Sequence, residues 1–549
     1  MKSNPTISLI FLLSATAALA QQPDQQMKMS TTEKPATIMA GLGSLHHPVS
    51  TNKPEAQRFF DQGLSLVFAF NHEQAIHSFK RAAEIDPQMA MAWWGVALAL
   101  GPNINQDVDL ARELAATDAA QKALALAKDK PEAERAYIEA LAKRYSLDPK
   151  SDLKKLAVTY KNAMGELSRK YPDDLDAAAL YAESMMDLRP WQLWNADGKP
   201  AEGTEEIVAV LESVLKRNPN HPGAIHYYIH TVEASPNPER ALAYAPKLPR
   251  LMPMAGHLVH MPAHIYERVG DYQSAARSNA DAAAADEAYF KASGTPGVYA
   301  MYYAHNLDFL AVANSMQGRY RDAIAASDKL VALAKPMVEQ MPMVEPFMAK
   351  SLLMMVRFHK WDEIMKQPQP DSSLKVTSAV WHFARGMAFA AKSMTEEAPS
   401  EQQAFVQAEK SVPAGAMFGL NPANRILKIA ECVLEARISG LSKIDQKVAV
   451  ELLRKGVEIE DSLAYDEPPA WFLPVRETLG GALMKQGDFA AAEQVFRDDL
   501  LRNRHNGRSL FGLMESLKAQ RRDYSKAQTE FEKAWQSADE KIALQDLWY

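Results

Sequence analysis

A short pattern of small and aromatic residues recurs along the chain and restricts the folds that it can adopt. It is seen first at Gly63, Ala75, Phe79, Ala82 and Pro87. This spacing suits two amphipathic helices joined by a turn, with small residues where the helices touch and a proline that ends the second helix. Further copies of the skeleton begin at Gly270, Gly318, Gly480 and Tyr524. Because strand signals are nearly absent, the pattern predicts an all-α array of helical hairpins.

The skeleton resembles the tetratricopeptide repeat, a helical hairpin of about 34 residues that stacks into a solenoid. Recognisable units cover residues 55–125, 175–345 and 470–540. The resemblance implies a right-handed superhelix whose first helices line the concave groove. Prolines and a glycine interrupt the pattern over 392–425, which predicts an irregular break between two solenoid segments. Whether the two segments close a central groove is left open.

The N-terminal composition indicates export. Lys2, an apolar run from Ile7 and the sequence Ala-Leu-Ala before Gln21 are typical of a cleavable signal peptide. The residues that follow are rich in Gln, Thr, Ser and Pro, which favours a flexible linker. We therefore expect a periplasmic or secreted protein. Its expected order is a signal peptide (1–20), a flexible linker (21–54), an N-terminal tetratricopeptide solenoid with a histidine-rich groove (55–391), an irregular break (392–425) and a C-terminal solenoid (426–549).

The composition of the whole chain excludes several classes of protein. Of the 549 residues, 47% are hydrophobic and 23% are charged, which is ordinary globular usage. The net charge of -7 shows that the chain lacks the excess of basic residues typical of nucleic-acid-binding proteins, so no nucleic-acid partner is expected. Beyond the N-terminus no apolar run could span a bilayer, so no integral membrane contact is expected. The single cysteine, Cys432, excludes an intramolecular disulfide and a cysteine-based zinc site.

Histidines cluster in the middle of the chain. Seven of the 14 lie between His221 and His305. Two segments, 226–233 and 260–267, both read His-x3-His-x2-Glu. On a helix, spacings of four and seven residues place the three side chains on one face. Pro262 falls inside the second segment, which predicts that the helix either starts near residue 258 or kinks there.

Six of these histidines occupy equivalent positions of three consecutive repeats. Aligned on Ala241, Ala275 and Ala323, they all fall in the first helix of a unit. The tetratricopeptide resemblance implies that first helices line the groove, so the six are expected to point inward together. A buried polar seam between helices is the alternative, but burying six imidazoles without a shared partner is costly. The candidate metal ligands are His226, His230, Glu233, His257, His260, His264 and His305.

The metal itself is not specified by the sequence. Imidazole and carboxylate ligands suit a divalent transition metal, and Zn, Cu, Fe, Mn and Ni are not distinguished. Six histidines exceed one ordinary site, so two adjacent ions are also consistent with the count. Searches for a phosphate-binding loop, a nucleophile elbow and a His-Glu-x-x-His motif found none.

A wider resemblance covers nearly the whole mature chain. Segments such as GPNIN (101–105) and YDEPPAWFLPVRETLG (465–480) are similar to those of a group of exported bacterial tetratricopeptide proteins of unestablished activity. The resemblance nominates further groove-lining residues, namely Asn103, Asn105, Glu267, Asp308, Glu467, Trp471 and Arg476. Asp308 stands where another histidine would be expected. GPNIN could equally be a loop that ends a helix, and Trp471 could equally be core.

Three functions compete at this stage. The first is a metal-dependent enzyme with a small-molecule or peptide ligand in the groove. The second is a metal-binding protein without catalysis. The third is a peptide- or protein-binding scaffold, in which the histidines form a structural seam and hold no metal. We favour a metal-binding solenoid, assign no catalytic residue and leave open whether the chain is an enzyme.

Overall fold

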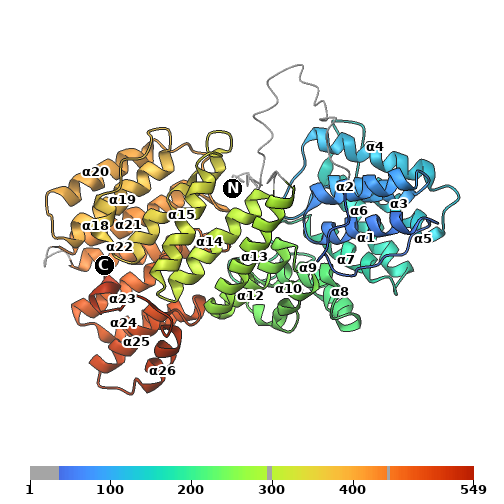
Figure 1. Cartoon of the computed structure of the whole chain (residues 1–549). Coiled ribbons are helices and arrows are strands. Elements are labelled where there is room, and N and C mark those ends of the chain that lie inside the picture. The colour runs from blue at the N-terminus through green and yellow to red at the C-terminus, as the bar shows by residue number, and fades with distance from the viewer. Residues whose placement is uncertain (1–35, 294–298, 442–445, 549) are drawn as a thin grey trace, which may run out of the picture. The chain divides into compact units, whose positions relative to one another are not determined.

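The computed structural model describes residues 36–293, 299–441 and 446–548 (Figure 1). The described chain is helical almost throughout, so the all-α prediction is confirmed. The chain divides into two compact units, Met1–Pro262 (unit 1) and Ala263–Tyr549 (unit 2), and each is described by itself. The predicted signal peptide, residues 1–20, lies outside the described residues.

Unit 1 is a succession of helices joined by short connections. Neighbouring helices pack pairwise along the chain, as in helical hairpins. The α-helices are α1 (Pro54–Phe68), α2 (His72–Ile85), α3 (Ala90–Leu100), α4 (Leu110–Leu126), α5 (Glu132–Ala142), α6 (Leu153–Lys170), α7 (Leu175–Met186), α8 (Thr204–Arg217), α9 (Pro222–Val232), α10 (Leu248–Leu251) and α11 (Gly256–His260). Two 3-10 helices, η1 (Pro238–Ala243) and η2 (Ala245–Lys247), precede α10.

The first hairpin shows why the repeated skeleton needs small residues. Phe79 of α2 is fully buried, and its ring lies against Gly63 of α1 and Gly95 of α3. A Cβ atom at either glycine would lie within 2.6 Å of that ring, so only glycine lets these helices approach so closely. The Asn71 side chain caps α2 by accepting from Gln74 N, and α2 ends at Ile85, two residues before Pro87. The predicted role of the skeleton is confirmed here.

The segment before α1 has no helix in its described part, residues 36–53. It nevertheless makes fixed contacts with the helices of unit 1, where its composition suggested a flexible linker. Leu42 is buried, and Ser50 donates through both its backbone N–H and its hydroxyl to Glu134 Oε1 at 2.5 Å. These contacts hold the segment against α5.

Unit 2 continues the same architecture. Its α-helices are α12 (Pro262–Val269, beginning at the boundary), α13 (Tyr272–Ser293), α14 (Ala300–Met316), α15 (Tyr320–Ala334), α16 (Glu345–Met348), α17 (Lys350–Arg357), α18 (Trp361–Met365), α19 (Lys375–Ala391), α20 (Glu397–Lys410), α21 (Ala423–Ser439), α22 (Gln446–Asp461), α23 (Val475–Gln486), α24 (Phe489–Arg502), α25 (Gly507–Ala519), α26 (Ser525–Ala534) and α27 (Gln545–Trp548). One 3-10 helix, η3 (Pro342–Val344), precedes α16.

The C-terminal hairpins of unit 2 repeat the contact seen around Phe79. Phe496 of α24 is fully buried, and its ring lies against Gly480 of α23 and Gly512 of α25. A Cβ atom at either glycine would come within 2.4 Å of the ring. The hairpins around Phe79 and Phe496, more than 400 residues apart in the chain, thus share one packing arrangement, in which a buried phenylalanine ring lies against two glycines.

The expected break over 392–425 lies inside unit 2. It contains α20 and the only sheet among the described residues, an antiparallel pair of β1 (Met417–Phe418) and β2 (Asn421–Pro422). Gly419 forms the turn with φ 61°, a conformation that favours glycine. No helix in the described part of the chain is long and apolar enough to cross a membrane.

Candidate metal centre

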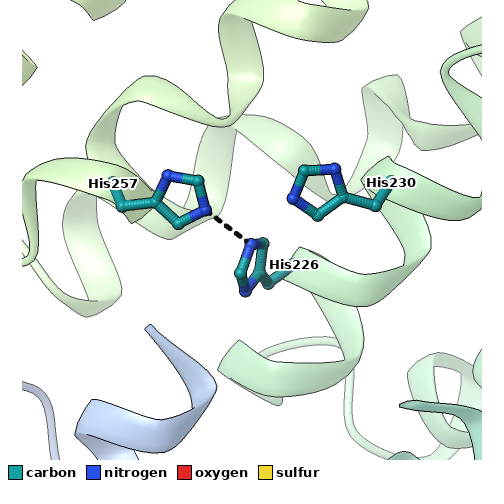
Figure 2. Close-up of side chains that lie close together, drawn as sticks. All are labelled: His226, His230 and His257. Atoms are coloured by element: carbon teal, nitrogen blue, oxygen red, sulfur yellow. Dashed lines mark hydrogen bonds between the residues drawn. The ribbon is translucent and has the colours of Figure 1, made fainter. Parts of the chain in front are cut away.

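Three histidines of unit 1 come together from two helices. His226 and His230 lie one turn apart on α9, and His257 comes from α11. Figure 2 shows the three rings turned toward one another. All three residues are buried, with exposed fractions of 0, 6 and 2%. One ring nitrogen from each lies within 4.8 Å of the other two, so this set, here called the triad, is close enough together to hold a metal ion after a small adjustment of the rings.

Hydrogen bonds on the far side of two rings fix which nitrogen faces inward. His226 Nδ1 lies 2.7 Å from the carbonyl oxygen of Phe68, which can only accept. His230 Nδ1 lies 2.9 Å from Glu233 Oε1, which accepts when the carboxylate is ionised. Both Nδ1 atoms therefore carry the proton, so both Nε2 atoms are the ring nitrogens without one. Metal-ligating histidines are held in this way, by a carbonyl or carboxylate on the other nitrogen.

The inward-facing nitrogens are already close together. His226 Nε2 lies 3.0 Å from His257 Nε2, the contact drawn in Figure 2. Two nitrogens bound to one tetrahedral zinc ion at ~2.0–2.1 Å would lie about 3.3 Å apart. Only a few tenths of an ångström separate that value from the one observed, so the geometry suits an ion without a large rearrangement.

The turn between α1 and α2 covers the triad and was missed by the sequence analysis. Phe70 has φ 54°, which is rare for a bulky residue. Its ring stacks on His230 and on His257, with centroids 6.0 and 5.6 Å apart, and meets His226 edge-on at 4.4 Å. The same turn supplies the Phe68 carbonyl. No pattern in the sequence marks this turn, because its partners lie more than 150 residues away.

The first residues of α9 pack closely against the end of α1, next to that turn. Pro222 occupies the first turn of the helix, and His221 Nδ1 accepts from Ala224 N at 3.1 Å as an N-cap. Gly223 leaves room for Phe68, because a Cβ there would lie 2.4 Å from the Phe68 ring. The glycine therefore lets α1 approach α9 closely enough for the Phe68 carbonyl to reach His226.

GPNIN lies at the end of α3, in unit 1. Asn103 is buried, with Nδ2 3.4 Å from His72 Nε2, and its Oδ1 accepts from Asn105 N at 2.8 Å. The His72 ring meets the Phe70 ring edge-on at 6.1 Å. Burial, together with the charges of Arg112 and Arg144, lowers the pKa of His72 to about 3. GPNIN thus positions a neutral histidine behind Phe70, and His72 was not among the predicted site residues.

His260, the fourth predicted ligand of unit 1, is fully buried on α11. Its ring lies 5.9 Å from that of His257, and the two rings are nearly parallel. The helix ends there: α11 stops at His260 and α12 begins at Pro262, the interruption expected from the proline.

The other predicted ligands belong to unit 2. His264 Nδ1 lies 2.7 Å from Glu467 Oε2, and its ring centroid is 5.7 Å from that of His305. The Tyr465 hydroxyl donates to Glu467 Oε1. Burial and the charge of Glu467 raise the pKa of Glu267 well above its usual range. The loop that carries Glu467 therefore folds back onto His264, one of the predicted ligands.

Three nominated groove residues of unit 2 have structural partners. Asp308 Oδ1 lies 2.5 Å from Lys350 Nζ, so the carboxylate that replaces the expected histidine forms a buried ion pair. Arg476 binds Asp461 through two contacts of 2.7 Å. Trp471 is buried in the apolar core, with its ring 5.8 Å from that of Phe383. Of the six histidines, four thus belong to unit 1 and two to unit 2, and two adjacent ions stay a prediction.

The helical hairpins and their glycine–phenylalanine contacts define the class of the fold, a tetratricopeptide-type array. No family model matches the chain, and no curated protein matches it. Among solved structures, a human IFIT1 dimer with m7Gppp-AAAA is 13% identical, with a TM-score of 0.33 over 90% of this chain and 92% of that one. Yeast Tom70 is 13% identical, with a TM-score of 0.28 over 85% and 89%. The TPR domain of P58(IPK) is 11% identical, with a TM-score of 0.23 over 85% and 98%. Values this low carry no argument about ligands or activity.

Proposed function

We propose that the protein binds a divalent transition metal through His226, His230 and His257. The observation that carries the proposal is the fixed proton on two of the rings. The Phe68 carbonyl and the Glu233 carboxylate hold the Nδ1 protons of His226 and His230, so both Nε2 lone pairs face the centre of the triad. An all-imidazole set suits Zn, Cu, Fe or Ni better than hard cations.

Three protein ligands leave one position open on a tetrahedral ion. Structural zinc sites are closed by four protein ligands, whereas catalytic sites keep the fourth position for water or substrate. The triad supplies three imidazoles, so a bound ion has a position for an exogenous ligand. This supports a site at which an ion acts on a ligand rather than one that only holds the helices together.

A metal-free seam makes a different chemical prediction. His226 Nε2 carries no proton. If no metal is bound and the rings are neutral, His257 Nε2 must therefore donate the hydrogen bond that joins these two atoms at 3.0 Å. An ion that enters the triad displaces this proton, because imidazole binds metal through a bare nitrogen. Metal binding should therefore move the His257 proton from Nε2 to Nδ1, and the 15N chemical shifts of the two ring nitrogens, which differ between the tautomers, measure this change.

The test of the proposal is metal content with a matched control. Full-length protein is purified without chelator, analysed for metals and reconstituted with Co²⁺, whose visible absorption reports imidazole coordination. His257→Gln should lose the bound ion and the spectrum. His382→Gln should keep both, because His382 bonds a carboxylate, Glu401, at 2.7 Å just as His230 bonds Glu233, but lies in unit 2. An excess of azide should change the wild-type spectrum if the fourth position is open.

Equal metal content in the wild type and His257→Gln would contradict the proposal. The triad would then be a hydrogen-bonded seam, and the scaffold function would be the better account of the fold.

We also propose that the protein is exported. The support is the sequence of residues 1–20, with its apolar run and Ala-Leu-Ala before Gln21. N-terminal sequencing of the mature protein should begin at Gln21, and an intact Met1 would refute cleavage.

A further inference from the structure

A second group of metal-binding side chains lies at the start of α7, apart from the triad. His47 precedes α1, Asp174 is the N-cap of α7, and Asp176 lies in its first turn. One ligand atom from each lies within 4.8 Å of the other two. His47 Nδ1 is 2.8 Å from Asp176 Oδ2. These three residues, here called the cavity cluster, did not figure in the sequence analysis.

His47 is held on every side before any ligand binds. Its backbone N–H donates to Asp61 Oδ1 at 3.1 Å, and its carbonyl accepts from Gln57 Nε2 at 2.8 Å. Its ring meets that of Tyr137 edge-on, with centroids 5.4 Å apart. A side chain fixed in this way loses little conformational entropy on binding a ligand, which is the condition for a preorganised site.

The two aspartates are oriented by different partners. Asp174 accepts from Ala177 N at 3.0 Å and from the Tyr137 hydroxyl at 2.8 Å. Asp176 Oδ1 lies 3.1 Å from His221 Nε2, yet the two buried atoms are not aligned for a hydrogen bond. Because His221 Nδ1 accepts from Ala224 N, its Nε2 carries the proton. His221 is therefore a buried donor beside the cluster, and it cannot itself be a metal ligand while it caps α9.

The cluster opens into a cavity of 880 Å³ that lies wholly within unit 1. Its charged lining includes the carboxylates of Glu134, Asp173, Asp174 and Asp176 and one guanidinium, that of Arg250. Carboxylates thus outnumber permanent cations in the lining, so the electrostatic potential of the cavity favours a positively charged ligand.

We propose that His47, Asp174 and Asp176 form a second divalent-metal site, with the cavity supplying room for water or a small ligand on the open positions. One imidazole and two carboxylates are a harder ligand set than the triad, and such sets accept Mn²⁺ and Fe²⁺ as well as Zn²⁺. The unaligned Nε2–H of His221 is placed to donate to an oxygen that joins the ion beside Asp176. The two sites of unit 1 would then differ in the metal that they retain.

A purely structural role must be separated from metal binding. The bond between His47 and Asp176 also ties residues 45–50 to α7, whether or not an ion is present. The test therefore needs a variant that removes a ligand charge and leaves the fold intact. Asp174→Asn does so, because asparagine caps a helix about as well as aspartate.

The matched control is Asp173→Asn, the same substitution one residue earlier. Asp173 lines the same cavity but is exposed and pairs with Arg217 at 2.8 Å, outside the cluster. Full-length protein, first saturated with Zn²⁺ at the triad by one equivalent, is titrated with Mn²⁺, and free Mn²⁺ is followed by its electron paramagnetic resonance signal. The wild type and Asp173→Asn should bind one Mn²⁺ per chain, and Asp174→Asn should bind it more than about tenfold more weakly.

Two results would overturn the inference. The first is a wild type that leaves Mn²⁺ free throughout the titration, which would make the cluster a tether for residues 45–50. The second is equal Mn²⁺ affinity in Asp174→Asn and the wild type. If Asp174→Asn melts well below the control, Asp176→Asn carries the test with the same expected loss. His257→Gln, titrated without the added Zn²⁺ equivalent, should bind Mn²⁺ at the cavity cluster as the wild type does, so the two proposals can fail separately.

Discussion

Two clusters in unit 1 bring metal-binding side chains together in opposite ways. The triad is fully buried, uses only imidazoles and lies under the Phe70 ring. The cavity cluster mixes one imidazole with two carboxylates and opens into a cavity of 880 Å³. The contrast follows from charge. A neutral imidazole can be buried at moderate cost, whereas a carboxylate needs water or several donors. Ligand type and solvent access are therefore linked in this fold, and together they would set the metal preference of each proposed site.

Chelation at neutral pH should produce the largest difference between the two clusters. An ion present at 1,000 times its dissociation constant stabilises the native state by about 4 kcal/mol. We expect the proposed triad site to hold its ion more tightly than the cavity cluster, so chelator should lower the melting temperature of the wild type and of Asp174→Asn to a similar degree. His257→Gln should melt at the same temperature with and without chelator.

Calorimetric scans of the three proteins check this prediction. His382→Gln serves as the control and should respond to chelator like the wild type. A chelator effect that survives in His257→Gln but disappears in Asp174→Asn would show that the cavity cluster, and not the triad, holds the more tightly bound ion.

Acid should destabilise unit 1 even without metal, through His72. Its pKa in the folded chain is about 3, against about 6.5 unfolded, so protons bind preferentially to the unfolded state. This contribution to stability is full above pH 6.5 and is lost as pH falls below it. Between pH 7 and pH 5 the loss is about 2 kcal/mol. In chelator, His72→Gln should show a shallower decline over that range in urea unfolding, and identical slopes would contradict the assignment.

Glu233→Gln should weaken the triad alone. The amide oxygen still accepts from His230 Nδ1, but the negative charge that fixes the ring and raises its basicity is lost. Removal of such a partner lowers metal affinity about tenfold, which corresponds to about 1.4 kcal/mol. Competition with a chromophoric chelator measures the change for Zn²⁺. Mn²⁺ binding at the cavity cluster should stay the same, and a parallel loss there would show that the two clusters are coupled.

Asp173→Asn should have the smallest effect. Its ion pair with Arg217 is exposed, with side-chain exposed fractions of 99 and 41%, and exposed pairs contribute little to stability. Thermal unfolding should not distinguish this variant from the wild type at physiological ionic strength. A clear loss of stability would mean that the rim of the cavity depends on this charge.

The hairpin architecture was predictable because it depends on local spacing. The skeleton predicted that Gly63 lies where two helices touch, and a Cβ at residue 63 would indeed lie within 2.6 Å of the Phe79 ring. His226 and His230 were likewise placed on one helix face by their spacing. Side chains four residues apart on a helix are neighbours whatever the rest of the chain does.

The surroundings of the triad were not predictable in this way. Phe68 and His226 are separated by 158 residues, and the sequence around Phe70 has no signal that it would adopt φ 54°. The role of Trp471 was also left open between groove and core, since an aromatic residue near a proline-rich turn suits either. In the structure its ring packs against Phe383, a contact that no local pattern predicts.

The sequence by itself determined the all-α class, the hairpin repeat and the helix faces that carry the histidines, because each is set by periodicity over a few turns. The tertiary structure alone decided which nitrogens face inward and that a second cluster exists. His47 and Asp176 lie 129 residues apart, in a segment without helix and on the first turn of α7. Contacts at that separation depend on how whole hairpins stack, and no local pattern encodes the stacking of distant side chains.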